Sequence, residues 1–338
     1  MASLKGVQIT AVVAANKFGV DFQEALNKTE KGNLLFSPCS VSIALAMISI
    51  GTRENTAAEL SKVLHWDTIP PQALHSQMKT FLESISDVND DNVELEMASR
   101  MFIRKDFGLS QSFREAAVKY YGVEEGILDY KHDVAGARRE VNSWVAQKTR
   151  EDAKILPINK SAFDSKTKLT LVNTAYLKAT WLSGAWKLLP HTSSFIVKRG
   201  KEVNIQMITQ RARLRYRLAN EVGSCGCQIL EVPLSKPNFS VFFLLPVVKP
   251  ALCDLEMSLT HHKLQRVLDL TEAVTPCDIQ VSKVWPDTLV YHIQVIKVQP
   301  DTFPCTIQVS KVQPDTFPCT IQVSKVQMTR HLPLYHSG

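Results

Sequence analysis

The apolar run VSIALAMISI, residues 41–50, is the feature that most restricts how this chain folds. Ser37 is a good N-cap residue, and Pro38 stands at the first helical position, where its missing N–H costs nothing. The predicted helix runs to Gly51 and is apolar on almost every side, so other elements must surround it. Its length is about half of what spans a bilayer. We therefore expect a core helix in a soluble protein without a membrane span.

The other patterned segments include both helices and strands. Thr56 and Glu59 form a capping box before a helix over 57–65, and Ser112 and Glu115 form another before a helix that ends at Gly122. A further helix is predicted over 139–149, and strands are predicted over 92–103, 168–181 and, around an SKPN turn, 227–246.

The segment KLTLVNTAYLKATW, residues 168–181, has an asparagine on an apolar strand face. Asn173 shares that face with Leu169, Leu171, Ala175 and Leu177. A buried amide costs several kcal/mol unless its hydrogen bonds are met, so Asn173 implies polar partners inside the core. The alternative is that the face of Val172 and Tyr176 is the buried one, which leaves Asn173 in water.

Four arginines alternate along RARLRYR, and they share one face of an extended segment: Arg211, Arg213, Arg215 and Arg217. Such a stripe would bind a polyanion. The plainer interpretation is the solvated face of a surface strand. The net charge of +6, from 39 basic and 33 acidic residues, does not by itself indicate nucleic-acid binding, and we expect none.

The sequence contains none of the common catalytic, cofactor or metal motifs. GxSxG, P-loop, GxGxxG and HExxH patterns are missing, and His261–His262 stands in a polar helix start, so we expect no enzyme and no cofactor. Seven cysteines include no CxxC pair, and Cys225 and Cys227 have no histidine nearby in sequence, so we expect reduced thiols and no metal site.

Several motifs together resemble the serpin superfamily, most of all its intracellular ovalbumin-type branch (clade B). Residues 33–64 resemble the serpin segment around the first buried helices, with its S-P-x-S and G-x-x-x-x-T-A motifs, and 169–181 resemble the long central strand of the main sheet. Segments 139–157, 229–246 and 255–270 resemble the helix crossing that sheet, two barrel strands and the helix that follows them. The matches stay in serpin order from about residue 5 to about residue 271.

The resemblance implies an α+β protein with the serpin fold, which has a large central β-sheet, surrounding helices and a β-barrel. It also implies that Ser37, Ser40 and Asn173 lie together as the buried "shutter" under the middle of the main sheet. The family completes this cluster with a histidine from a later strand, for which the sequence shows no match. Such a cluster would explain why the amide of Asn173 stands on an apolar strand face.

A fourteen-residue phrase occupies the C-terminal region in four repeats, 272–285, 286–299, 300–313 and 314–327, and the last two are identical. We therefore divide the chain into a serpin-like body (1–271), repeats in place of the reactive loop and last strands (272–327) and a tail (328–338). PDTFP offers turn chemistry and Ile307 and Val309 alternate, so a meander is one option. Four prolines in residues 300–327 favour a loosely ordered, edge-like segment with few contacts to the core.

Serpins inhibit proteases when an exposed loop is cleaved and its small-residue hinge inserts into the main sheet as a new strand. The resemblance therefore implies an inhibitor of serine or cysteine proteases. No such hinge is visible: Ala273 is the last alanine, and the reactive-site bond is not recognisable, although Arg330 offers a trypsin-like cleavage point. We expect that the chain does not trap a protease.

The alternative function is a non-inhibitory serpin-fold binding protein or an inert truncated product. We expect a monomer. The N-terminal segment lacks the shape of a signal peptide, which predicts a cytoplasmic location; the alternative is the extracellular space, as for many serpins.

Overall fold

The structure is a computed structural model of the chain. It describes residues 10–29, 36–149, 158, 162–182, 187–198, 201–220, 226–236, 239–247, 252–268, 274–282, 293–298 and 306–308. The chain divides into two compact units, which are described separately. The smaller unit comprises Met1–Val7, Asp90–Glu94 and Lys178–Leu289, and the larger comprises Gln8–Asn89, Leu95–Leu177 and Val290–Gly338.

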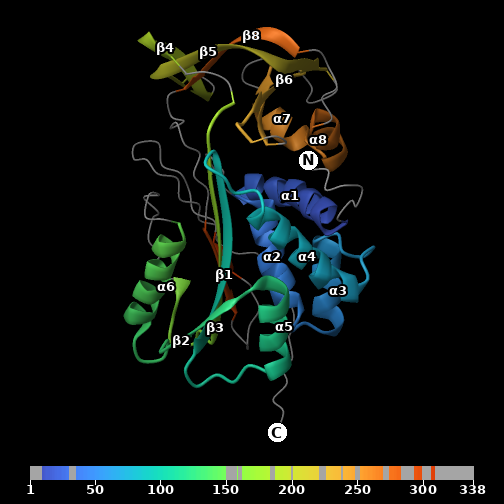
Figure 1. The fold of residues 1–338 in the computed structure, drawn as a ribbon, viewed down its shortest axis with the longest axis vertical. Helices are drawn as coiled ribbons and strands as arrows, with labels where there is room; N and C mark the ends of the chain where they lie inside the picture. The colour runs from blue at the N-terminus through green and yellow to red at the C-terminus, as the bar shows by residue number, and fades with distance from the viewer. Residues whose placement is uncertain are drawn as a thin grey trace. The chain divides into compact units, whose positions relative to one another are not determined.

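The larger unit is built around a five-stranded sheet (Figure 1). In spatial order its strands are β10 (Thr306–Gln308), β9 (Ile293–Val298), β3 (Leu169–Ala179), β1 (Val93–Arg104) and β2 (Glu124–Leu128). The β1–β2 pair is parallel, whereas β9 pairs antiparallel with both β3 and β10. The strand predicted over 168–181 is therefore an internal strand of this sheet.

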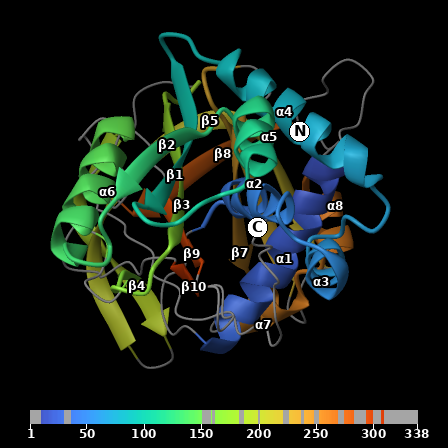
Figure 2. The same cartoon turned by 90° about the horizontal axis from the view of Figure 1, so that it is seen from below.

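Helices cover both faces of this sheet (Figure 2). On one side lie α1 (Thr10–Thr29), α2 (Pro38–Ser49), α3 (Glu54–Val63), α4 (Pro71–Ser86) and α5 (Gln111–Tyr121), and on the other lies α6 (Val134–Lys148). Met101 and Leu171 point into the core shared with the first group, while Phe102 and Val172 pack with α6. Successive strand residues alternate between the two layers, as the pleat requires.

The prediction of a helix that other elements surround is confirmed. Helix α2 begins at Pro38 with Ser37 as its N-cap, and all nine residues from Ser40 to Ile48 are buried. Gly51 follows the helix, whose C-cap is Ile50. An apolar helix of this kind is stable in water only because the neighbouring helices and the sheet enclose it.

The predicted starts of the next helices are wrong, although the helices exist. Helix α3 begins at Glu54, before Thr56, and has no side-chain cap. Helix α5 is capped by Ser110, whose Oγ accepts a hydrogen bond from Phe113 N, rather than by Ser112. Ser110 and Ser112 both offer a cap for α5, and the structure uses the first, whereas the N-cap residue of α3 is Arg53. The predicted end at Gly122 is confirmed, with φ of 58° in the left-handed region.

Strand β3 has both faces buried, so neither single-face interpretation describes it fully. Asn173 and Val172 are each 0% exposed, and Tyr176 is 1% exposed. A strand covered by helices on one side and by α6 on the other has no solvated face. The sequence pattern could not show this, because both faces contain apolar residues.

The smaller unit contains a second five-stranded sheet and two short helices (Figure 1). Its elements are β4 (Lys187–Lys198), β5 (Lys201–Ala219), β6 (Cys227–Pro233), β7 (Ser240–Pro246), α7 (Leu252–Ser258), α8 (His261–Leu268) and β8 (Val274–Ser282). The strand order is β4-β5-β6-β7, with β8 paired to β5. The predicted strand pair over 227–246 is confirmed as β6 and β7. Leu255 packs with Ile229, Phe242 and Leu244 on one sheet face.

The prediction that the repeats form a loosely ordered, edge-like segment is wrong for residues 293–298, which lie inside the sheet, whereas β10 is an edge strand of that sheet. Residues 293–298 pair with six residues of β3, from Leu169 to Thr174, and 306–308 pair with β9. Of the four prolines that argued against a strand, Pro300 and Pro304 stand between these two segments, and Pro314 and Pro318 lie outside the described residues. The backbone groups on that edge of β3 need partners in a buried sheet, and β9 supplies them.

Candidate functional site

A hydrogen-bonded cluster lies between β3, β1 and α2. Asn173 on β3 is 0% exposed, and its Oδ1 accepts a hydrogen bond from Ser40 Oγ on α2. Its Nδ2 donates to Ser99 Oγ on β1 at 2.8 Å. Ser40 and Ser99 are also buried, at 3% and 6% exposure. The amide therefore joins a helix to two strands at a point that water does not reach.

Ser37 enters this cluster indirectly. Its Oγ accepts a hydrogen bond from Ser40 N at 3.2 Å, as an N-cap, and its side chain is half-buried. Ser37 thus orients the first turn of the helix that carries Ser40. The structure places Ser40 and Asn173 in direct contact and Ser37 one step away. The shutter role of the three residues remains a prediction.

Ser99 was not predicted as a member of this cluster. Its position follows the same alternation as Met101 and Ile103, whose side chains pack in the core with the helices. A serine in that row of β1 was the signal, because a hydroxyl on a buried strand face needs a partner. The partner can be named only once β1 and β3 are known to be neighbours.

The strand beside β3 on this side comes from the second repeat. In the β3–β9 register, Asn173 is directly opposite Gln294. The histidine that the family resemblance implies for this cluster has no match among the residues that the structure describes here.

The arginine stripe lies on β5, which has neighbours along both edges and is therefore not an edge strand. Arg215 is 53% exposed and its Nη1 lies 3.1 Å from Glu231 Oε2, while Arg217 Nη2 donates to the carbonyl of Arg266 at 3.1 Å. For Arg211 and Arg213 the structure describes only the backbone, opposite Asp278 and Pro276 of β8. The two described arginines are thus already partnered.

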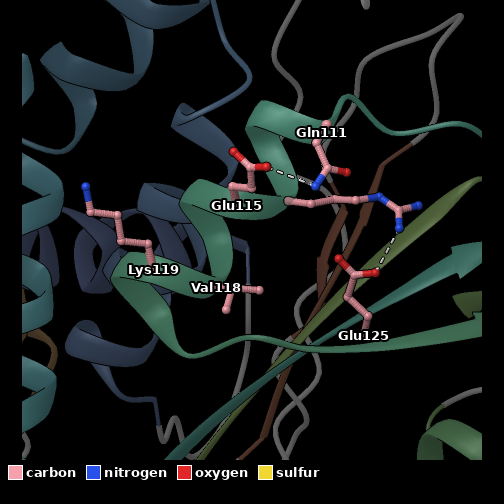
Figure 3. A pocket seen from close by; sticks show the side chains of 6 residues that line it. Gln111, Glu115, Val118, Lys119 and Glu125 are labelled. Carbon is pink, nitrogen blue, oxygen red and sulfur yellow. Dashed lines mark hydrogen bonds and ion pairs between the residues drawn. The ribbon is translucent and has the colours of Figure 1, made fainter.

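A shallow hollow of about 430 Å³ lies between α5 and β2 (Figure 3). Its charged residues pair among themselves: Arg114 Nη1 is 3.1 Å from Glu125 Oε2, and Gln111 Nε2 donates to Glu115 Oε1 at 3.0 Å. Figure 3 shows Gln111 and Glu115 side by side on α5 and Glu125 on the neighbouring strand. A ligand here would have to displace both contacts, so the hollow is a poor candidate for a binding site.

Cys39 and Cys227, whose side chains the structure describes, are free thiols. Burial raises the pKa of Cys39 to about 11, so its thiol is protonated at neutral pH and is a weak nucleophile. Within the described ranges, no group of three histidine, cysteine or acidic residues is placed to hold a metal ion.

Comparison with known proteins gives the family. The family model for serpins, described as "Serpin (serine protease inhibitor)", matches residues 13–284, which is most of the chain. This chain belongs to the serpin family. Within it, the chain resembles the ovalbumin-type, clade B branch. The match ends 13 residues beyond the boundary drawn at 271 and includes β8, and the domain division itself remains a prediction.

The related serpins include leukocyte elastase inhibitors. That of Xenopus tropicalis is 30% identical over 271 residues, covering 79% of this chain and 70% of the relative. That of Sus scrofa is 33% identical over 236 residues, covering 69% of this chain and 60% of the relative. The chain therefore spans about 60–70% of the length of these relatives.

Solved structures show the same fold. Emu (Dromaius novaehollandiae) ovalbumin superposes with a TM-score of 0.70 at 24% identity, covering 83% of this serpin and 73% of that chain. Cleaved kallistatin, in a complex with heparin, superposes with a TM-score of 0.71 at 20% identity, covering 81% and 80%. Among the helices that the structure describes, none is both long enough and apolar enough to cross a membrane.

Proposed function

We propose that this serpin engages serine proteases in a substrate-like way and that the encounter ends in cleavage, without a stable covalent complex. The observation that carries the first half is the family match over residues 13–284, together with relatives named leukocyte elastase inhibitor. The contact of Ser40 with Asn173 supports a serpin-type link between α2 and the main sheet.

The second half of the proposal, that no stable covalent complex forms, rests on the strand that pairs with β3. Trapping requires a hinge of small residues that becomes a new strand in the main sheet. In this chain the strand next to β3 is β9, whose sequence IQVIKV has bulky residues, and no alanine follows Ala273. A protease that cuts between or after the repeats releases no segment of the required composition.

The test is incubation of the full-length chain with a panel of serine and cysteine proteases, followed by a denaturing gel. We expect cleavage products and transient competition with a small substrate. A covalent band at the summed mass would refute the second half of the proposal. A chain that no protease in the panel binds or cuts would refute the first half.

Two controls make this result specific. A protease whose catalytic nucleophile is replaced by alanine must give no covalent band, because trapping requires the acyl-enzyme. The Arg330→Ala variant should resist trypsin-like cleavage at that bond, and mass spectrometry of the products should show whether other bonds are used.

A polyanion is proposed as a second partner, on the surface that joins β5 to α8. Arg217 binds the carbonyl of Arg266, so the arginines of β5 lie beside a helix that also contains His262 and Lys263. The kallistatin structure of the same fold is a complex with heparin. Clustered cations attract sulfated or phosphorylated polymers, with a dependence on salt.

This second proposal is tested by retention on immobilised heparin in a salt gradient. Arg215→Ala should elute at lower salt than the parent chain. Arg114→Ala is the matched control, since it removes one equally paired arginine from the larger unit. Equal elution of the two variants would contradict the proposed surface.

We further propose a monomer in the cytoplasm. The free thiols of Cys39 and Cys227 are in keeping with a reducing compartment.

A further inference from the structure

The sheet face that carries Arg215 also carries the carboxylate of Glu231 on β6. The two residues are directly opposite each other in the β5–β6 register, so their side chains share that face. Arg215 Nη1 lies 3.1 Å from Glu231 Oε2. The other carboxylate oxygen, Oε1, accepts a hydrogen bond from Ser240 Oγ of β7 at 2.7 Å. Each oxygen of Glu231 thus has a partner that holds it in place.

Water reaches the two members of this ion pair to different extents. The side chain of Glu231 is 13% exposed, whereas that of Arg215 is 53% exposed. An anion from solution therefore approaches the guanidinium of Arg215 and finds Nη1 already facing a carboxylate. Any anion that binds the remaining N–H donors of Arg215 lies close to the negative charge of Glu231 and is repelled by it.

Cations of helix α8 lie near this pair. Arg217 stands two residues along β5 from Arg215, which is about 7 Å in a strand, and on the same face. Arg217 Nη2 donates to the carbonyl oxygen of Arg266 at 3.1 Å, so the last turn of α8 reaches the strand at this point. Arg266 is exposed and lies one helical turn from Lys263. A polymer of anions along this surface therefore meets Arg215 together with the cations of α8.

We infer that Glu231 is an internal competitor for Arg215 and that it restricts the surface of β5 and α8 to polyanions of high charge density. This inference rests on the polyanion partner proposed above. The tethered carboxylate acts at a high effective concentration, so a polymer with few charges cannot compete with it at Arg215. A densely sulfated polymer contacts Arg215 and the α8 cations at the same time, and the added attractions outweigh the repulsion by Glu231.

The selection is tested with Glu231→Gln in the full-length chain. The glutamine removes the charge, keeps the shape and retains an oxygen that can accept from Ser240. Binding is measured at about 0.15 M salt on immobilised heparin and on immobilised chondroitin sulfate, which carries fewer sulfates. We expect the affinity for chondroitin sulfate to rise about two- to fivefold, the range set by one partly exposed ion pair, and the affinity for heparin to rise less.

Glu125→Gln is the matched control. It makes the same change in net charge and breaks an arginine–glutamate pair of the same 3.1 Å length, that of Arg114 in the larger unit. We expect this control to leave the ratio of the two affinities unchanged. If Glu231→Gln changes the ratio no more than the control does, net charge explains the result and the inference is wrong.

The double variant Arg215→Ala/Glu231→Gln shows whether the glutamate acts through Arg215. We expect it to bind both polymers as Arg215→Ala alone does, and urea midpoints report that each variant is folded. A gain from Glu231→Gln that persists without Arg215 would overturn the inference. Weaker heparin binding by Arg215→Ala with no gain from Glu231→Gln would sink the internal competitor and leave the polyanion surface standing. Unchanged binding by Arg215→Ala would remove the surface itself, and the inference with it.

Discussion

Replacing Asn173 by alanine gives the sharpest test of the buried cluster. The side chain is 0% exposed, accepts a hydrogen bond from Ser40 and donates one to Ser99 at 2.8 Å. The substitution removes both hydrogen bonds and leaves two serines, 3% and 6% exposed, without that partner. Each stranded polar group costs about 1–3 kcal/mol, so we expect a loss of about 2–4 kcal/mol in the free energy of unfolding.

The assay is urea unfolding, followed by tryptophan fluorescence and circular dichroism, with stability taken from the midpoint and slope. Asn204→Ala is the matched control, because Asn204 is an exposed asparagine on a strand, and its replacement should change stability by less than about 0.5 kcal/mol. The double variant Asn173→Ala/Ser99→Ala should lose less unfolding free energy than the two single variants lose together, because it also removes the Ser99 hydroxyl that would otherwise be left without its partner. A loss for Asn173→Ala no larger than that of the control would refute the reasoning.

Three further predictions follow from local geometry. Gly122→Ala should lower the free energy of unfolding, measured in urea, by about 1 kcal/mol. The residue has a φ of 58°, and an added methyl group meets no atom within 4 Å, so the cost is backbone strain alone. No measurable loss would contradict this prediction. Burial lowers the pKa of His75, whose Nδ1 lies 2.7 Å from Tyr121 Oη, so the folded state binds fewer protons than the unfolded state. The free energy of unfolding should therefore fall as the pH drops below about 6.5. His75→Gln should show a smaller fall between about pH 7 and about pH 5.5. Partial burial acts to raise the pKa of Glu124, but hydrogen bonds from Lys148 and the Trp144 indole bring that pKa below its ordinary value. The carboxylate therefore stabilises the fold above about pH 4.5, and this stabilisation is lost as the pH falls through the folded pKa. Glu124→Gln should flatten the acid side of the profile of unfolding free energy against pH.

Much of the larger unit was predictable from residue patterns. The length and all-round apolarity of residues 41–50 required a surrounded helix, and α2 is one. Gly122 ended α5 as predicted, since glycine takes the left-handed conformation without cost. Helix starts were less predictable, because Ser110 and Ser112 compete to cap α5 and because α3 begins after Arg53 without any side-chain cap.

The candidate site was only partly predictable. Asn173 stood out because an amide on an apolar strand needs partners, and Ser40 was implied by family resemblance. Ser99 was not identified, since its pairing depends on β1 lying beside β3, which is a contact between residues 74 positions apart in sequence.

The sequence by itself determined the presence of the core helix, the long central strand and four repeats, of which only the last two are identical. Tertiary structure alone decided what the repeats do. The first repeat pairs with β5 in one sheet, and the second pairs with β3 in another. The physical reason is that the residue pattern of a strand shows which of its faces is apolar. The sheet that the strand joins depends on which other strand has unpaired backbone groups along its edge and on which residues of that strand lie opposite. For β9 those residues are Leu171 and Asn173, and they are contributed by a segment more than a hundred positions earlier in the chain.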